Sequence, residues 1–121
     1  QQFVQPLLPS DPGEIEPKQL AELLRARRAL PVDIREPASY GRFRIPGAKN
    51  IPSAEVQNRR SELRSADGKI RVLYSRTTEE AREIASSLIS KGFQVAYLNG
   101  GLLGWEADGL EVERGESPVT K

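Results

Sequence analysis

A polar segment at residues 75–80 has the composition and the position of a reactive or anion-binding loop. It follows the apolar residues 72–74 and precedes an amphipathic stretch. Its residues are Ser75, Arg76, Thr77, Thr78, Glu79 and Glu80. A turn between a strand and a helix aims several backbone N–H groups at one point, where anions bind or nucleophiles sit. Ser75 is therefore a nucleophile, a nucleophile position without its reactive group, or a helix N-cap.

The composition removes the usual partners of a catalytic serine. The 121 residues include no histidine and no cysteine, which excludes disulfides, thiolate metal sites, thiol catalysis and the most common general base. No cofactor and no metal ion are expected. Lys69 and Lys91 fall at the far ends of their expected elements, so a Ser–Lys pair is not expected either. The net charge of +1 gives no indication of a nucleic-acid partner.

Hydrophobic periodicity predicts alternating helices and strands. The strongest helix, at 79–91, carries an apolar stripe with i, i+3, i+4 spacing and ends before Gly92. Other helical segments are expected from Pro17 onward, at 37–43, at 53–63 with Ser53 as N-cap and Val56 facing inward, and after Gly101. Strands are expected at 30–36, 48–51, 69–74 and 93–99, with 69–74 in the centre.

Strands separated by helices require crossover connections, so the sheet should be mainly parallel. Functional groups in such folds gather at the carboxyl ends of the strands. Three strand ends are candidates: Asp33 to Glu36, Ser75 to Thr78, and Asn99 to Gly101. The last of these contains Gly100 and Gly101, which read as turn glycines with positive φ.

The chain resembles the rhodanese-like domain family over about residues 14–112. Four segments carry the resemblance: VDIRE at 32–36, RIPGAKNIP at 44–52, VLYS at 72–75 and NGGLLGWEADGLEV at 99–112. The resemblance implies an α/β, three-layer fold with a central, mainly parallel sheet of about five strands and helices on both faces. The expected organisation is an extended N-terminal arm at 1–13, a rhodanese-like domain at 14–113 and a C-terminal tail at 114–121.

Active members of this family carry a cysteine directly after the strand that corresponds to VLY. The cysteine takes a sulfane sulfur from a donor such as thiosulfate, becomes a persulfide, and passes the sulfur to cyanide or a thiol. In this sequence the position holds Ser75. A helix N-terminus can draw a thiol of pKa about 8.5 toward the thiolate, but the same field does not ionise an alcohol near neutral pH. The resemblance therefore implies a sulfurtransferase-type domain that is inactive as written, through a natural or an engineered Cys-to-Ser change.

The resemblance also places the loop and rim residues of the site. Arg76 to Glu80 form the anion or substrate loop, in which Arg76 is the main cation. Glu79 and Glu80 stabilise the start of the helix but weaken an anion site. The rim residues are Asp33, Arg35 and Arg44, with Arg42 as a further contributor. For Asp33 and Arg35 a salt bridge at the strand end is the competing interpretation, and Trp105 is expected in the core.

Three functional hypotheses follow from these residues. The first is an inactive sulfurtransferase-family domain whose partners would be a small sulfur-containing anion or a thiol acceptor. The second is a non-catalytic binding or regulatory module that holds a small anion or a protein partner in the same cleft. The third is a phosphatase, because cell-cycle dual-specificity phosphatases share the fold. It is disfavoured, because the Cys, five residues, Arg motif would need arginine at Ala81, and Arg82 comes one residue late.

The sequence contains no apolar run near the roughly 20 residues that span a bilayer, so no membrane span is expected in this chain. The start at Gln1 without methionine predicts a processed form or an excised fragment. The compartment is left open, with a slight preference for the cytoplasm over an exported or membrane-tethered fragment.

Overall fold

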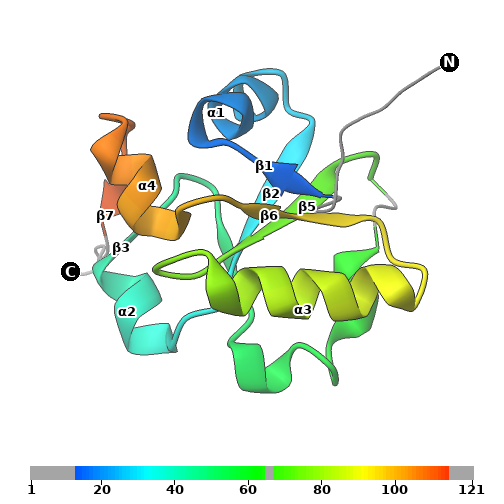
Figure 1. Ribbon diagram of the computed structural model, residues 1–121. Coiled ribbons are helices and arrows are strands. Elements are labelled where there is room, and N and C mark those ends of the chain that lie inside the picture. The colour runs from blue at the N-terminus through cyan, green and yellow to red at the C-terminus, as the bar shows by residue number, and fades with distance from the viewer. Residues whose placement is uncertain (1–12, 65–66, 115–121) are drawn as a thin grey trace, which may run out of the picture.

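A five-stranded parallel sheet forms the centre of the protein (Figure 1). The computed structural model describes residues 13–64 and 67–114, so nearly all of the expected arm at 1–13 and of the tail at 114–121 lies outside the described residues. The sheet order is β1 (Glu14–Ile15), β6 (Val95–Leu98), β5 (Ile70–Tyr74), β2 (Ala29–Asp33) and β4 (Lys49–Asn50). The apolar segment that precedes Ser75 is therefore the central strand, as predicted.

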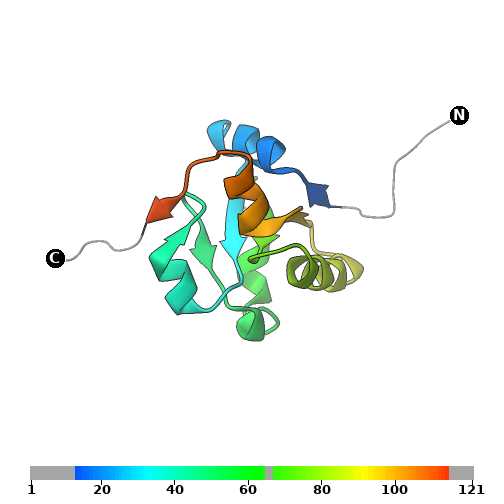
Figure 2. The same ribbon diagram turned by 60° about the vertical axis from the view of Figure 1, so that its left-hand side comes forward.

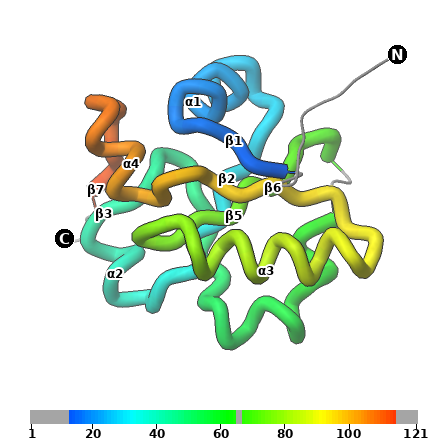
Figure 3. The backbone as a smooth tube through the Cα atoms, viewed as in Figure 1, coloured from blue at the N-terminus to red at the C-terminus, as the bar shows by residue number. Residues whose placement is uncertain are grey.

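Helices cover both faces of this sheet, which confirms the predicted three-layer α/β fold. Leu73 points to the face covered by α3 (Glu79–Ser90), whereas Val72 and Tyr74 point to the face covered by α1 (Pro17–Arg25) and α4 (Gly101–Ala107). The two faces thus alternate along β5 with the period of two that a strand requires. Figure 3 shows β1 lying along β6 at one edge of the sheet.

The predicted helix at 79–91 corresponds to α3. Its apolar stripe is buried or half-buried against the sheet and comprises Ala81, Ile84, Ala85, Leu88 and Ile89. Gly92 follows the helix with a φ of +92°, the left-handed conformation expected after a helix C-terminus. Within the described residues, no helix is both long and apolar enough to cross a membrane.

The prediction of a helix at 53–63 was wrong. The segment forms two short 3₁₀ turns, η1 (Ser53–Glu55) and η2 (Arg60–Leu63). Ser53 is the first residue of η1, and Pro52 takes the N-cap position without a side-chain hydrogen bond. Val56 does face inward, together with Leu63, but the two are seven residues apart with no apolar residue three or four positions from Val56. A continuous α-helix would therefore have no apolar stripe to bury.

A two-stranded antiparallel pair closes the end of the fold near α2 (Pro37–Arg42). It joins β3 (Phe43–Arg44) to β7 (Glu113–Arg114). Figure 2 shows the end of the described chain returning beside the segment that follows α2. This contact joins residues about seventy positions apart, and it fixes the position of β3 at the edge of the site described next.

Candidate functional site

A cavity of about 510 Å³ lies at the carboxyl ends of β2 and β5. Its walls come from the segment after β2, from α2, from the loop between β5 and α3, and from α4. The lining residues are Ile34, Arg35, Glu36, Ser39, Arg42, Phe43, Ser53, Ser75, Arg76, Glu80, Leu102, Leu103 and Glu106. The cavity therefore occupies the edge of the sheet at which the sequence predicts functional groups.

The loop that follows β5 is held in place by the start of α4. The N–H groups of Leu102 and Leu103 donate to the carbonyl oxygens of Ser75 and Arg76, at 2.9 and 3.1 Å. The N–H of Gly100 donates to the hydroxyl of Thr78 at 2.7 Å. Neither Ser75 nor Thr78 caps α3 with its side chain, although Thr78 occupies the N-cap position. The third predicted strand end thus supports the loop rather than lining the cavity.

The carbonyl groups of this loop accept hydrogen bonds from α4, but several of its backbone N–H groups have no acceptor in the described part of the chain. Among the residues that the structure describes, the backbone N–H groups of Arg76, Thr77 and Thr78 donate no hydrogen bond. They precede the first turn of α3, where the helix dipole favours negative charge. The loop therefore retains N–H groups from which a small anion or a carbonyl oxygen could accept hydrogen bonds.

Replacing Gly101 with alanine is expected to destabilise the protein by about 2–4 kcal/mol. Gly101 has a φ of +57°, and a Cβ there would lie 2.6 Å from the carbonyl oxygens of both Arg76 and Thr77. Gly109→Ala is the matched control, because Gly109 also has a positive φ of +76°, but a Cβ there would meet no atom within 4 Å. Urea denaturation should show the larger loss for Gly101→Ala. Equal losses would contradict the role of this close contact.

The hydroxyl of Ser75 is directed at a carboxylate. Ser75 is buried, with 8% of its surface exposed, and its Oγ donates to Oε1 of Glu80 at 3.1 Å. The neighbouring Glu79 instead accepts from the Thr77 hydroxyl at 3.1 Å. Hydrogen bonds from its own backbone N–H and from Thr77 lower the pKa of Glu79 below its usual value. Of the two glutamates in the first turn of α3, Glu80 is therefore the one that contacts Ser75 and the cavity.

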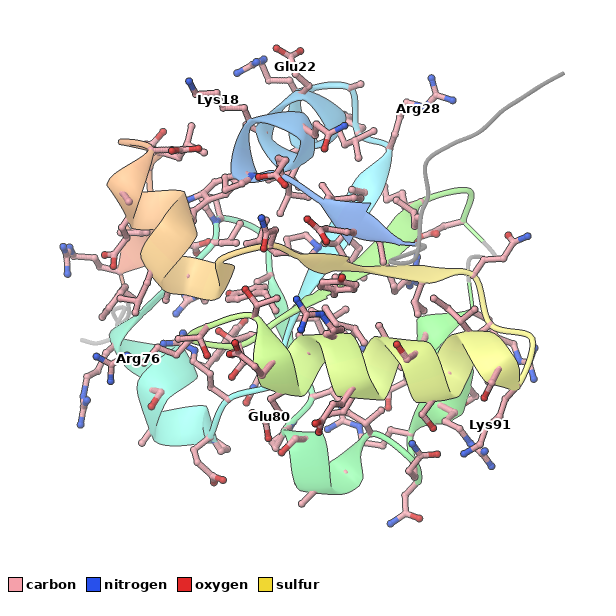
Figure 4. All side chains as sticks on the ribbon, viewed as in Figure 1. Lys18, Glu22, Arg28, Arg76, Glu80 and Lys91 are labelled. Atoms are coloured by element: carbon pink, nitrogen blue, oxygen red, sulfur yellow. The ribbon has the colours of Figure 1, made fainter. Side chains whose placement is uncertain are left out.

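The charges around the cavity are balanced. Three arginines line it (Arg35, Arg42 and Arg76), and so do three glutamates (Glu36, Glu80 and Glu106). Figure 4 shows Arg76 and Glu80 near the beginning of α3. The cavity also has an apolar wall, in which Leu103 is 45% exposed. This mixture suits a ligand with polar and apolar parts better than it suits a bare anion.

Asp33 and Arg35 form a buried ion pair at the end of β2. Asp33 is fully buried, and Nη2 of Arg35 lies 2.6 Å from its Oδ2. The backbone N–H of Arg35 also donates to Oδ1 at 2.9 Å, and Nη2 donates to the carbonyl oxygen of Phe43 at 2.7 Å. Burial disfavours the charge of Arg35, but the hydrogen bond and the charge of Asp33 outweigh burial and raise its pKa. This is the strand-end salt bridge that the sequence offered as the alternative to a catalytic role.

Arg44 does not line the cavity, although the family pattern places it on the rim. Its Nη2 lies 3.2 Å from Oε2 of Glu113, and its guanidinium lies over the ring of Tyr40 at 4.7 Å. Thr77, Thr78 and Glu79 also belong to the loop without lining the cavity.

Sequence reasoning missed the contribution of α4 to the cavity. Leu102 and Trp105 of this helix are buried in the core, and the Trp105 ring N–H donates to the carbonyl oxygen of Glu111 at 2.7 Å. Leu103 and Glu106 follow one position later, on the adjacent side of the helix and three residues apart, and they line the cavity together with Leu102. Because Trp105 was expected in the core, helical spacing from Trp105 could have identified Leu103 and Glu106 as residues outside the buried face.

Comparison with known proteins assigns this α/β domain to a family. Residues 16–108 match the rhodanese-like domain. The chain belongs to the rhodanese-like domain family.

Several relatives carry sulfurtransferase names. A sulfurtransferase of Allochromatium vinosum is 31% identical over 102 residues, which cover 83% of this chain and 94% of that protein. The crystal structure of a thiosulfate sulfurtransferase from Pseudomonas aeruginosa superimposes with a TM-score of 0.77 at 27% identity, over 86% of this chain and 20% of that one. The domain therefore has sulfurtransferase-family relatives.

Other relatives are longer proteins with different names. An HTH-type transcriptional regulator of Mycobacterium tuberculosis, Rv0324, is 39% identical over 105 residues, which cover 82% of this chain but 45% of the regulator. The match to an uncharacterized protein of Synechocystis covers 59% of that protein. The chain thus spans about half the length of these curated relatives.

Proposed function

We propose that this rhodanese-like domain does not transfer sulfur and that its cavity binds a ligand without forming a persulfide. In this proposal Ser75 occupies the position of the persulfide-forming cysteine. The proposal is supported most directly by the hydrogen bond from Ser75 to Glu80, 3.1 Å long. A persulfide or thiolate at this position would face a carboxylate at hydrogen-bond distance, and like charges at that distance oppose ionisation. The serine hydroxyl, in contrast, satisfies the carboxylate.

The ligand of the proposed module is a small anion or a segment of a partner protein. Two features of the cavity favour a protein segment. The arginines that line the cavity do not outnumber the glutamates, and one of them, Arg35, is already paired with Asp33, so a bare anion gains little from the surrounding charge. The exposed Leu103 offers an apolar contact in the same cavity as Arg76, whose backbone N–H donates no hydrogen bond within the described residues. A segment with a carbonyl or carboxylate group next to an apolar side chain would use both.

A second candidate is a sulfurtransferase whose cysteine has been replaced, naturally or by engineering. The sulfurtransferase relatives favour it. In that case a cysteine at position 75 would attack the sulfane sulfur of thiosulfate as its thiolate. A new S–S bond would form, the S–S bond of thiosulfate would break, and sulfite would leave.

Substituting Ser75→Cys separates the two candidates. Our proposal predicts that the variant gains no sulfur atom by intact-mass measurement after incubation with thiosulfate, and that it produces no thiocyanate from cyanide above the wild-type background. Ser39→Cys provides a control, because Ser39 lines the same cavity away from the loop. A gain of one sulfur atom with thiocyanate turnover in Ser75→Cys alone would establish the sulfurtransferase instead. Matching urea denaturation curves would show that both variants are folded.

A further inference from the structure

A second cavity, of about 420 Å³, lies at the other end of α3 from Ser75. It is lined by Arg60, Arg64 and Lys91 together with Gln57, Asn58, Ser61 and Phe93, and by no carboxylate of the described residues. Figure 4 shows Lys91 at the end of α3 opposite Arg76 and Glu80. Twelve helical residues at about 1.5 Å each place the two sites about 18 Å apart. This basic cavity is therefore separate from the site of the proposed function.

The three positive charges of the basic cavity are not neutralised by the described part of the protein. Within residues 13–64 and 67–114, Arg60, Arg64 and Lys91 form no ion pair. Nearby carboxylates are already paired with other cations. Those pairs are Glu55 and Glu62 with Arg59 at 2.9 and 2.7 Å, Glu62 with Lys49 at 2.6 Å, and Asp67 with Arg71 at 2.6 Å. The neighbouring acids are thus committed, and the cavity keeps its positive charge.

The helix dipole explains only part of this arrangement. Lys91 is the C-cap residue of α3, where a cation is favourable without any ligand. Arg60 belongs to η2 and Arg64 follows it, so neither is placed by the end of α3. The convergence of two arginines from a separate segment on the same cavity points to an anionic ligand.

The basic cavity also has an aromatic wall. The guanidinium of Arg64 lies 4.8 Å from the centre of the Phe93 ring, and Nζ of Lys91 donates to Oε1 of Gln57 at 2.9 Å. A smaller cavity of about 160 Å³ shares Arg64 and Phe93 and continues along Gln94. A ligand could therefore place a charged group among the three cations and a planar group against the Arg64 guanidinium, which already covers the Phe93 ring.

We propose that the basic cavity binds a small polyphosphorylated molecule of the nucleoside diphosphate class. Arginine side chains bind phosphate oxygens through paired, charge-assisted hydrogen bonds. Three cations balance more negative charge than one phosphate group carries at neutral pH. The volume lies within the range of small-molecule sites, about 300–1,000 Å³, and leaves room for more than phosphate alone.

Amide NMR titrations of the whole chain with ADP and, separately, with inorganic pyrophosphate test this proposal. Saturating shifts are expected at Arg60, Arg64, Lys91 and Phe93, while the loop at 75–80 stays unchanged. The double variant Arg60→Ala/Arg64→Ala should weaken binding about tenfold or more, since the loss of even one charge-assisted hydrogen bond costs about that factor. These side chains are exposed, so the variant should remain folded.

The matched control is Lys18→Ala/Arg28→Ala, which removes two exposed cations from the region of α1. Its affinity should stay within about twofold of wild type, because these residues lie outside the cavity. Tighter binding of ADP than of pyrophosphate would show that the organic part is recognised, and equal binding would assign the site to the phosphate groups alone. Tighter binding of ADP therefore supports the proposal, and equal binding would overturn its assignment to the nucleoside diphosphate class. No saturating shift at millimolar ligand, or equal losses in both double variants, would overturn the proposal.

Discussion

In a Ser75→Cys background, replacing Glu80 with glutamine is expected to make the new thiol about three- to tenfold more reactive at neutral pH. The Ser75 side chain lies 3.1 Å from the Glu80 carboxylate, and a like charge at that distance raises the pKa of a thiol by about 1–2. Removing the charge restores the thiolate. The gain is smaller than the tenfold change in thiolate fraction per pKa unit, because nucleophilicity falls as the pKa falls, with a Brønsted slope of about 0.4–0.5.

The rate of alkylation by iodoacetamide, measured as a function of pH, reports both the thiol pKa and the reactivity of the thiolate. Glu79→Gln in the same background is the matched control, because it removes the same charge from the same helical turn without removing a contact to position 75. Arg76 and Arg42 are unchanged in both variants, so their effects cancel. Equal rates in the two double variants would show that Glu80 does not set the charge at this position.

The difference between the Glu80→Gln and Glu79→Gln variants shows whether Glu80 contributes to the lack of sulfur transfer that we propose. If Glu80 suppresses the thiolate, introducing a cysteine at position 75 is not enough for sulfur transfer, because the carboxylate at the start of α3 keeps the thiol protonated. Ser75 and Glu80, at the start of α3, would then both favour a site that forms no persulfide. If Glu80 has no influence, the absence of a thiol in the 121 residues is the whole obstacle.

Local sequence patterns predicted the elements that carry the site. The apolar stripe from Ala81 to Ile89 fits only a helix, and α3 forms there. The apolar segment at 70–74, which lies between turn residues, predicts a central strand, and β5 forms there. Because parallel strands present their carboxyl ends at one edge, the order of elements was enough to bring Arg35 and Ser75 to the same cavity.

Contacts between distant segments were beyond such patterns. Arg44 pairs with Glu113, 69 positions later, and a two-residue strand gives no periodic signal by which to expect it. Thr78 occupies the N-cap position of α3, but its hydroxyl accepts from the N–H of Gly100 at 2.7 Å instead of capping the helix. Leu103 and Glu106 required the orientation of α4, which is set by burial of Trp105. The residues that sequence reasoning missed are therefore those placed by tertiary packing.

Replacing Asp33 with alanine is expected to destabilise the protein by about 3–5 kcal/mol. Asp33 has no exposed surface, and its carboxylate accepts hydrogen bonds from the backbone and the side chain of Arg35. Without it, the guanidinium of Arg35 keeps its charge in a half-buried position and has lost the carboxylate that balances it, although it still donates to the carbonyl oxygen of Phe43. Most of the loss comes from this uncompensated charge rather than from the missing attraction.

Urea denaturation of Asp33→Ala, of Arg35→Met and of the double variant tests this explanation. The double variant should be more stable than Asp33→Ala, because it removes the uncompensated charge and replaces it with an apolar side chain. Glu22→Ala provides the exposed comparison, since Glu22 pairs with Arg25 at 2.7 Å while 73% of its side chain remains accessible. Its loss should stay below about 1 kcal/mol. A loss for Asp33→Ala no larger than that for Glu22→Ala would mean that the ion pair of Asp33 with Arg35 does not hold the end of β2 in place.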